Sequence, residues 1–385
     1  MKKRFLRDIA EIQTGPFGSQ LHKEDYVDVG TPIVTVEHLG SRVFSEQNLP
    51  MVSDADKSRL SKYVLKKGDI VFSRVGSVDR CSFVDQKHDG WMFSGRCLRV
   101  RPSEEVDPLF LYYFFCLNTT KEFVRSIAVG ATMPSINTKL LGEVEVVCPE
   151  IEEQRKIADI LSKIDDKIEE NQKINENLAV LLQTVYQERF GDVDKASKQG
   201  VLSDICSYSK DRVAVSELDV STYFSTENML PRKAGSTEAT SLPTMPQTTA
   251  CHKGDTLISN IRPYFKKIVY CEDECGCSTD VLCFMPNQPQ YSAYLFSTLY
   301  ADKFFAFMVA GAKGTKMPRG DKQQIMTYPI VMPSEVALAE FNTIALPLIK
   351  QIYSNRAENR RLSLLRDTLL PKLMSGELDV SDIDL

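Results

Sequence analysis

The chain has 385 residues, 43% of them hydrophobic, with 47 basic and 52 acidic residues and a formal net charge of −5. That length fits two or three domains with ordinary cores, and the acidic excess argues against a protein that binds nucleic acid through net positive charge alone. The N-terminus lacks the apolar segment of a signal peptide, and no run approaches the ~18 apolar residues of a membrane helix. The ten cysteines have no disulfide-scaffold spacing, so we expect a cytoplasmic protein with reduced thiols.

Residues 1–148 are predicted to form a globular domain of mixed helix and strand. A Lys-Gly-Asp turn leads into the apolar strand of "LKKGDIVFSRVG". An aromatic helix should follow "EEV", because Asp107 suits the N-cap and Pro108 the first helical position ahead of "LFLYYFFCL". The segment closes with a Met-Pro loop in "VGATMPSIN" at 129–137 and the strand "VEVVCP".

After Pro149 the apolar spacing changes from about 2 to about 3.6 residues, which is the period of an α-helix. No glycine or proline occurs between Glu150 and Phe190. We therefore predict that 149–193 is one long helix.

Residues 194–333 repeat the first domain. "CHKGDTLISNIR" follows its counterpart by 186 residues, and "AKGTKMPRGD" at 312–321 and "YPIVMP" follow theirs by 184. Ser292 precedes a second aromatic helical run. Three collinear matches at nearly one offset predict an internal duplication. A second long helix and a tail should occupy 334–385, where Pro347 is expected to kink or delay the helix.

The two long helices have an asparagine at the same central heptad position, Asn171 and Asn355. An antiparallel pair whose facing residue numbers sum to 522 would place Asn171 opposite Gln351 and Lys167 opposite Asn355. A buried polar residue at such a position fixes register. The predicted fold class is α+β: two globular domains separated by two long antiparallel helices, with an internal pseudo-twofold repeat. In the alternative, each helix packs only on its own globular domain.

The acidic residues are concentrated on the helices, since 1–148 and 194–333 each have a net charge of +1 and the helical segments −5 and −2. Basic residues interleaved with glycine and aromatic residues on loops suit contact with phosphates and base edges. In the first domain the candidate DNA-binding residues are Ser19, Arg74, Ser77, Arg80, Arg96, Thr132, Ser135, Asn137 and Lys139. In the second they are Ser259, Asn260, Arg262, Tyr264, Lys266, Lys267, Lys313, Lys316, Arg319 and Lys322. For any single lysine, the alternative is a solvated surface charge.

Catalytic motifs are weak. The sequence has no GxxxxGK[ST], GxGxxG, HExxH or GxSxG pattern, and "SNIRPYF" matches a methyltransferase Asn-Pro-Pro-Tyr pocket only with wrong spacing. Cysteines 271, 275, 277 and 283 would allow a zinc site, but the matching stretch of the first domain keeps only Cys97. We therefore expect no catalytic residue, metal or cofactor in this chain.

These phrases resemble one known family. "GPFGSQL", "GDIVFSRVG", "GATMPSINTKLLGEVEVVCPEIEEQRKIADIL", "TKMPRGDKQQI" and "LLPKLMSGELDV" look like recurrent phrases of the specificity subunit of Type I restriction-modification systems, called HsdS. The resemblance covers essentially the whole chain. The second copy departs from it, because "PSEVALAEFNTIALPLI" lacks the Glu-Glu-Gln of the first.

The resemblance implies a non-catalytic subunit of a host-defence complex. Each globular domain would be a target recognition domain for one half of a split DNA sequence. The helices would set the gap and dock adenine methyltransferase subunits, two in number, with restriction and translocase subunits joining them. S-adenosylmethionine, ATP and Mg would then bind to those partners. The alternatives are a coiled-coil scaffold with protein-binding end domains, or a DNA methyltransferase or nuclease with hidden motifs.

Overall fold

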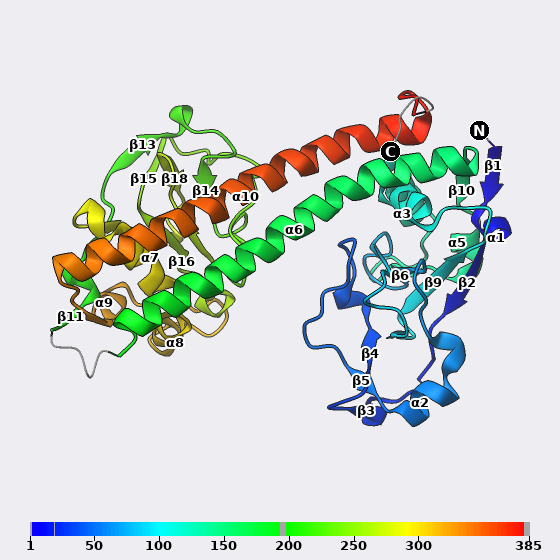
Figure 1. The fold of residues 1–385 in the computed structure, drawn as a ribbon, viewed down its shortest axis with the longest axis horizontal. Coiled ribbons are helices and arrows are strands. Elements are labelled where there is room, and N and C mark those ends of the chain that lie inside the picture. The colour runs from blue at the N-terminus through cyan, green and yellow to red at the C-terminus, as the bar shows by residue number, and fades with distance from the viewer. Residues whose placement is uncertain (1, 19, 193–197, 381–385) are drawn as a thin grey trace. The chain divides into compact units, whose positions relative to one another are not determined.

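The computed structural model describes residues 2–18, 20–192 and 198–380. Its contacts divide the chain into two compact units, residues 1–169 with 359–385 and residues 170–358, which we call unit 1 and unit 2. The division falls inside two long helices, α6 (Ile151–Phe190) and α10 (Glu335–Ser375), so each unit contains part of both (Figure 1).

Unit 1 contains three antiparallel or mixed sheets. The central one has the order β2-β9-β6-β7, with β2 (Ala10–Thr14), β9 (Cys97–Pro102), β6 (Ile70–Ser73) and β7 (Cys81–Phe83). A second has the order β3-β5-β4-β8, with β3 (Tyr26–Val27), β5 (Met51–Val52), β4 (Thr31–Val34) and β8 (Met92–Phe93). The third pairs β1 (Lys2–Phe5) with β10 (Glu145–Cys148).

Short helices join these strands. The α-helices are α1 (Leu6–Ile9), α2 (Asp54–Arg59), α3 (Pro108–Cys116), α4 (Asn118–Ser126) and α5 (Thr138–Gly142). The 3₁₀ helices are η1 (Lys23–Asp25), η2 (Val36–His38) and η3 (Ser61–Tyr63). The predicted start of the aromatic helix is confirmed, because the Asp107 carboxylate accepts a hydrogen bond from Phe110 N at 2.9 Å and Pro108 is the first residue of α3.

In unit 2 the central sheet and the two-stranded sheet keep the strand order of unit 1, whereas the last two strands of the second sheet are exchanged. Its central sheet is β12-β19-β16-β17, with β12 (Cys206–Tyr208), β19 (Val281–Pro286), β16 (Thr256–Ser259) and β17 (Ile268–Tyr270). The second is β13-β15-β18-β14, with β13 (Arg212–Ala214), β15 (Gln247–Cys251), β18 (Cys275–Cys277) and β14 (Tyr223–Phe224). The third pairs β11 (Gln199–Val201) with β20 (Pro329–Val331).

The helices of unit 2 follow those of unit 1 at a constant spacing. They are α7 (Ser292–Tyr300), α8 (Asp302–Ala310) and α9 (Lys322–Met326), each starting 184 residues after α3, α4 and α5 respectively. The 3₁₀ helices are η4 (Leu202–Asp204), η5 (Val215–Glu217), η6 (Pro263–Phe265) and η7 (Pro289–Tyr291). With the matching strand order of the central sheets, this spacing confirms the internal duplication.

The repeated Lys-Gly-Asp sequence forms the same turn in both units. Gly68 and Gly254 have φ values of +91° and +95°, which a residue with a Cβ adopts only with strain. The Asp69 carboxylate accepts a hydrogen bond from Lys66 N at 2.8 Å, and Asp255 accepts one from His252 N at 2.8 Å. The motif is therefore conserved between the two copies for the shape of the turn before the central strand.

The cores of both units contain side chains from both long helices. In unit 1, Leu161 of α6 and Leu373 of α10 pack with α3 and the central sheet. In unit 2, Tyr186 of α6 and Phe341 of α10 pack with α7 and α8. Each helix thus divides its apolar face between two cores, which differs from the alternative in which each helix packs on one domain only.

Pro347 does not delay the second helix. Helix α10 begins at Glu335 and its helical assignment continues through Pro347. Ala345 and Ile349, on either side of the proline, are fully buried in the core of unit 2. This packing holds the segment helical although the proline removes one backbone hydrogen bond.

The predicted register of the helix pair is wrong. Within unit 2, Asn171 Nδ2 donates to Glu358 Oε2 at 2.7 Å, and not to Gln351. The observed residue numbers sum to 529 instead of 522, so the partner helix is displaced by one heptad. Asn171 is nevertheless buried in a polar layer, with 2% of its surface exposed.

The second predicted polar layer is displaced in the same direction. Asn355 Nδ2 donates to Asn175 Oδ1 at 2.9 Å, where the prediction has Lys167 as its neighbour. Gln351 Nε2 donates to the Asn355 side chain on the same helix at 2.7 Å. Asn175 is the residue that sequence reasoning missed at this layer.

The register is displaced because the apolar residues of the helices are buried against the globular domains and not between the two helices. The predicted pairing places Ile174, Leu181 and Leu365 between the helices. In the structure their exposed fractions are 37%, 47% and 47%. Burial against the sheets and short helices of each unit decides which helix face points inward, and a heptad pattern contains no information about that contact.

Candidate nucleic-acid interface

Each unit presents two loops that are hydrogen-bonded to each other. In unit 1 they are 74–80, after β6, and 129–137, before α5; in unit 2 they are 260–267, after β16, and 312–321, before α9. We call each set a loop pair. Gly76 N donates to Pro134 O at 2.8 Å, and Arg262 N donates to Pro318 O at 2.8 Å. Because the same main-chain contacts occur twice, the loop pair is part of the duplicated fold.

The Met-Pro loops are closed at their base. Val129 and Ser135 exchange main-chain hydrogen bonds of 2.9 and 2.8 Å, and Lys313 and Arg319 exchange two of 2.9 Å. Met133 and Met317 at the tips have exposed fractions of 66% and 51%. A large apolar side chain at the tip of a braced loop is suited to contact with another molecule.

Two predicted arginines of unit 1 are used inside the domain. Arg74 is half-buried, donates from Nη1 to Gly95 O at 3.1 Å, and lies over the Phe17 ring at 5.4 Å. Arg80 donates to Leu39 O. These contacts fix the loop that follows β6, so part of the positive charge has a structural role.

The other predicted cations of unit 1 are available for contact with a ligand. Arg96 and Lys139 are exposed, and within the described residues neither side chain has a hydrogen-bond or ion-pair partner. The main chain of Arg96 joins the first loop, since its carbonyl oxygen accepts a hydrogen bond from Arg74 N at 2.8 Å. Arg96 is therefore an unpaired charge beside the loop pair.

The predicted polar residues of unit 1 differ in role. Ser77 and Thr132 are exposed on the two loops. Ser135 Oγ donates to Val129 O at 3.2 Å, and Asn137 is the N-cap of α5, where its Oδ1 accepts from Leu140 N at 2.9 Å. Ser19 lies outside the described residues.

In unit 2, two predicted polar residues are buried. Ser259 is 2% exposed and donates to Ile261 O at 3.3 Å. Asn260 is 7% exposed, and its Oδ1 has no hydrogen-bond partner in the part of the chain that the structure describes. Tyr264 is half exposed at the adjacent turn. Tyr264 is thus accessible to a ligand, whereas Ser259 supports the loop.

Several predicted cations of unit 2 are held by neighbouring groups. Lys266 Nζ lies 2.8 Å from Asp302, which is also bonded by Lys233, and these two contacts lower the pKa of the Asp302 carboxyl. Lys267 donates to Thr226 O, and burial lowers its pKa.

The Met-Pro loop of unit 2 contains both paired and unpaired cations. Lys313 pairs with Asp321 at 2.5 Å, Arg319 pairs with Asp280 at 2.9 Å, and Lys322 lies over the Tyr208 ring at 5.9 Å. Arg262 and Lys316 are exposed and without a side-chain partner among the described residues. The unpaired charge of unit 2 is thus placed on both loops of its loop pair.

A hollow of about 550 Å³ lies at the loop pair of unit 1. Its lining includes Ser77, Arg80, Arg125 and Pro134, so it reaches from one loop to the other. Arg125 Nε lies 3.7 Å from Oδ2 of Asp79, which also lines the hollow. Two of the predicted DNA-binding residues therefore line one cavity.

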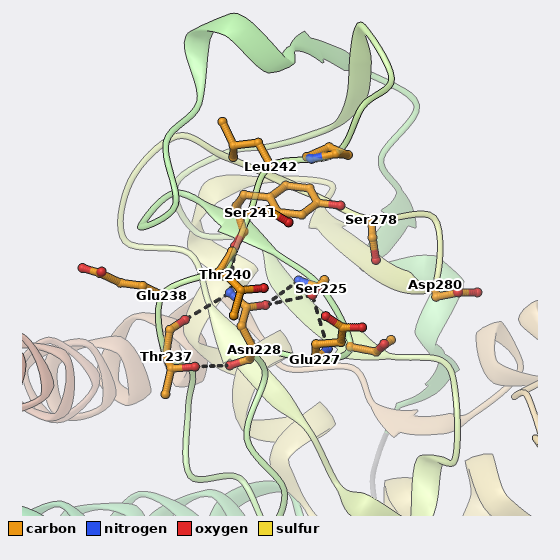
Figure 2. A pocket seen from close by; sticks show the side chains of 14 residues that line it. Ser225, Glu227, Asn228, Thr237, Glu238, Thr240, Ser241, Leu242, Ser278 and Asp280 are labelled. Atoms are coloured by element: carbon orange, nitrogen blue, oxygen red, sulfur yellow. Dashed lines mark hydrogen bonds between the residues drawn. The ribbon is translucent and has the colours of Figure 1, made fainter. Parts of the chain in front are cut away.

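A hollow of about 360 Å³ in unit 2 was not predicted from the sequence. Figure 2 shows Asn228 at its base, where Oδ1 accepts from Ser225 N at 2.6 Å and Nδ2 donates to Thr237 O at 3.0 Å. Asp280 also lines it and connects it to the Met-Pro loop through Arg319. The hydroxyl-rich stretches "STENML" and "GSTEATS" are the sequence feature that could have indicated this hollow.

The cysteine-rich segment of unit 2 belongs to a buried core. Cys271, Cys275, Cys277 and Cys283 pack there with Cys251, and the Sγ atoms of Cys271 and Cys275 are 3.5 Å apart. In the described ranges, no three His, Cys, Asp or Glu side chains are arranged to hold a metal ion. Nor does any helix there combine the length and apolarity that crossing a membrane would require.

The structure is that of a two-domain protein with a duplicated α+β domain, a hydrogen-bonded and cation-bearing loop pair in each copy, and long helices that contribute to both cores. Residues 1–179 match the family model of the Type I restriction modification DNA specificity domain. The Type I restriction enzyme MjaIX specificity subunit of Methanocaldococcus jannaschii is 24% identical, over 98% of this chain and 93% of that protein.

Two further proteins are similar to this chain. The HindI specificity subunit of Haemophilus influenzae is 32% identical over 40% of this chain and 35% of that protein. The crystal structure of the S subunit of a Type-I restriction-modification system from M. genitalium has the same fold, with a TM-score of 0.63 at 17% identity over 97% of this chain and 95% of that one. The chain is therefore similar to Type I specificity subunits over essentially its whole length.

Proposed function

We propose that this chain is the sequence-specific DNA-recognition subunit of a Type I restriction-modification complex and has no catalytic role of its own. Residues 1–148 and 194–333 each recognise one half of a bipartite target. The helical segments 149–193 and 334–385 set the distance between the half-sites and dock the other subunits. The protein works in the cytoplasm, where its DNA target lies.

The single observation that supports this proposal best is the loop pair built twice by the same main-chain hydrogen bonds. Arg96 at the loop pair of unit 1 and Arg262 in that of unit 2 have no side-chain partner among the described residues, and each Met-Pro loop has an exposed methionine at its tip. Arginine contacts guanine or phosphate, and the braced main chain holds it in place. Because the side chains differ between the copies, the two half-sites should have different sequences.

The charge distribution supports dependence on partner subunits. Each globular segment has a net charge of only +1, and several of its cations are paired within the domain. Affinity for duplex DNA depends on how many phosphates are neutralised. We therefore propose that methyltransferase subunits supply most of the phosphate contacts, while this chain supplies the sequence preference.

The helices offer one docking feature twice. Val180 and Leu181 of α6 have exposed fractions of 67% and 47%, and Leu364 and Leu365 of α10 have 70% and 47%. The second pair follows the first by 184 residues, the spacing of the internal repeat. Matching exposed apolar pairs support docking of two copies of the methyltransferase subunit, to which restriction subunits add. S-adenosylmethionine, ATP and Mg are then needed by those partners.

A domain exchange tests the division of labour. In the complex with its methyltransferase subunits, residues 1–148 are replaced by the equivalent domain of another specificity subunit, and bound duplexes are selected from a random-sequence library. We expect one half-site to change and the other to persist. A change in both half-sites would contradict independent recognition domains. Binding without any sequence preference in the wild-type complex would favour the scaffold alternative, and S-adenosylmethionine binding by the isolated chain would favour the enzyme alternative.

A heptad insertion tests the spacing role. Seven residues inserted into both long helices should alter the gap between the half-sites and leave their sequences unchanged, because a heptad preserves the packing face of a helix. The same library selection measures the gap. An unchanged gap would remove the spacing role from the helices.

A further inference from the structure

We propose that Arg319 reads a guanine in the half-site recognised by unit 2 and that Asp280 is the residue that positions it. This inference rests on the proposed function. It names one specificity-determining side chain and one positioning side chain within the loop pair, and it distinguishes them from the cations that only attract phosphate.

The main chain of Arg319 is fixed on both sides. Arg319 exchanges two hydrogen bonds of 2.9 Å with Lys313 across the base of the Met-Pro loop, and it also forms a β-bridge with Ile261 of the neighbouring loop. Its Cα position is therefore set by two separate segments of the chain. A base-reading side chain needs such a fixed origin, since hydrogen bonds to base edges tolerate little displacement.

The guanidinium of Arg319 is oriented by one carboxylate. Arg319 Nη2 donates to Asp280 Oδ1 at 2.9 Å, while 55% of the side chain remains exposed. A guanidinium has five N–H donors in a rigid plane. One edge can bind Asp280 while other donors remain free for the O6 and N7 atoms of guanine, which is the arrangement that arginine uses for this base.

Asp280 is itself held in place. Asn260 N donates to Asp280 O at 2.8 Å, which ties the turn before β19 to the loop that follows β16. Figure 2 shows Asp280 at the hollow of unit 2, beside Ser278. The main chain of Asp280 is therefore attached to the loop that forms a β-bridge with Arg319, which keeps its carboxylate within reach of the guanidinium.

Charge balance separates Arg319 from its neighbours. Its positive charge is neutralised locally by Asp280, so it adds little to the general attraction of phosphates. Arg262 and Lys316 on the same loop pair have no such partner among the described residues. A neutralised but oriented arginine contributes sequence preference, whereas an unpaired one contributes affinity for any duplex.

Unit 1 has no such arginine–carboxylate pair at the matching positions. Arg74 N donates to Arg96 O at 2.8 Å, as Asn260 N does to Asp280 O, so Arg96 occupies the place of Asp280. Ser135 occupies the place of Arg319, since it forms the same bridges in its Met-Pro loop. A carboxylate-oriented arginine is therefore expected to act on one half-site only.

The test uses the full chain in its methyltransferase complex and a library of duplexes with a randomised core. The variants are Arg319→Ala, Arg319→Lys and Asp280→Asn, with Arg262→Ala as the matched unpaired cation. We expect Arg319→Ala and Arg319→Lys to reduce the preference for one guanine by about 10- to 100-fold and to leave the other half-site unchanged. Asp280→Asn should reduce the same preference by less, and because it removes the negative charge beside Arg319 it should also make binding slightly more dependent on salt. Arg262→Ala should weaken binding to all sequences and lower the salt slope by about 1.

Two outcomes would overturn this inference alone. One is that Asp280→Asn tightens binding to every sequence and leaves the preference for the guanine unchanged, which would make Asp280 a simple counter-ion. The other is that the Arg319 variants alter no base preference although the wild-type complex selects a sequence; the proposed function would then stand without this assignment. A wild-type complex that selects no sequence would overturn both. Arg319→Lys guards against a folding artefact, because it keeps the charge and the loop while removing the planar fork.

Discussion

Units 1 and 2 share the topology of their central sheets, but different types of side chain are buried where the long helices meet the globular domain. In unit 1, Asp165 of α6 is 5% exposed, accepts from Tyr113 OH at 2.8 Å and pairs with Arg366 of α10 at 2.7 Å. At the matching positions of unit 2, Ile349 and Leu182 are each 1% exposed in an apolar core. The fold is therefore specified by which positions are buried, and either a satisfied ionic cluster or an apolar contact can occupy them.

The two units also hold their surface loops against the helices in opposite ways. In unit 1, Arg42 extends from a loop and donates to Glu169 of α6 at 2.8 Å. In unit 2, Arg356 extends from α10 and donates to Lys233 O of a loop at 3.1 Å. The same attachment is thus achieved with the arginine on either side, so side-chain identity is a poor guide to matching positions in the two copies.

The largest expected effect comes from breaking the ionic cluster of unit 1. Asp165→Ala leaves the Tyr113 hydroxyl without its acceptor and leaves Arg366 with Asp367 as its remaining partner, and we expect a loss of about 3 kcal/mol in the free energy of unfolding. Denaturant titration of the full chain measures it. Glu152→Ala, which removes an exposed i,i+3 partner of Arg155, is the control and should cost less than about 0.5 kcal/mol.

A second test gives unit 1 the apolar side chains that unit 2 has at the matching two positions. The double variant Asp165→Ile with Arg366→Leu copies the apolar contact of unit 2 and should regain most of the stability lost in Asp165→Ala, because apolar replacement of a buried ion pair is often neutral. A double variant as unstable as the single one would show that the two junctions are not interchangeable.

The exposed apolar pairs should behave alike in the two helices. Replacing Val180 and Leu181 by serine, or Leu364 and Leu365 by serine, should each weaken one methyltransferase contact by about 2 kcal/mol, roughly 30-fold. Stoichiometry by native mass spectrometry should then show one bound subunit for either variant and none for the combination. Equal occupancy in all variants would place the docking surface elsewhere.

The observed helix register can be separated from the predicted one by double-mutant cycles. Asn355→Ala should cost about 1 kcal/mol and be coupled to Asn175→Ala, because their side chains share a hydrogen bond of 2.9 Å. The cycle between Asn355 and Lys167 should show no coupling. Coupling to Lys167 instead would restore the register whose residue numbers sum to 522.

The smallest effect is a pH dependence present in unit 2. The carboxylates of Glu274 and Asp211 accept hydrogen bonds from the His252 imidazole and raise its pKa. A raised folded-state pKa stabilises the protein below the ordinary value of about 6.5, and this contribution is lost as pH rises through the folded-state value. Because the imidazole is 43% exposed, we expect at most about 0.5 kcal/mol. Urea midpoints of the wild type and His252→Gln between pH 5.5 and 8.5 should converge at high pH; a constant difference would contradict the linkage.

Features encoded by neighbouring residues were predictable from the sequence. The turn at Gly68 and Asp69, the N-cap at Asp107 and the internal repeat depend on short-range geometry, and the structure confirms them. The helix register depends on which face of each helix a distant domain covers, and the prediction of Asn171 with Gln351 was wrong for that reason.

The candidate site was only partly predictable for a similar reason. The sequence indicates which loops contain cations, but not which cations are engaged inside the domain, as Arg74 and Arg80 are. The role of Asn137 as an N-cap was open to sequence reasoning, because it precedes a short helical pattern. The ion pair of Arg319 with Asp280 joins residues 39 positions apart and required the structure.

Main-chain hydrogen bonds, and not the side chains at the loop tips, join the two loops of each loop pair. Substitutions at those tips therefore leave the supporting framework intact, and each unit can change independently of the other. The residues of one loop pair can therefore be replaced while the other loop pair, both cores and both long helices stay as they are.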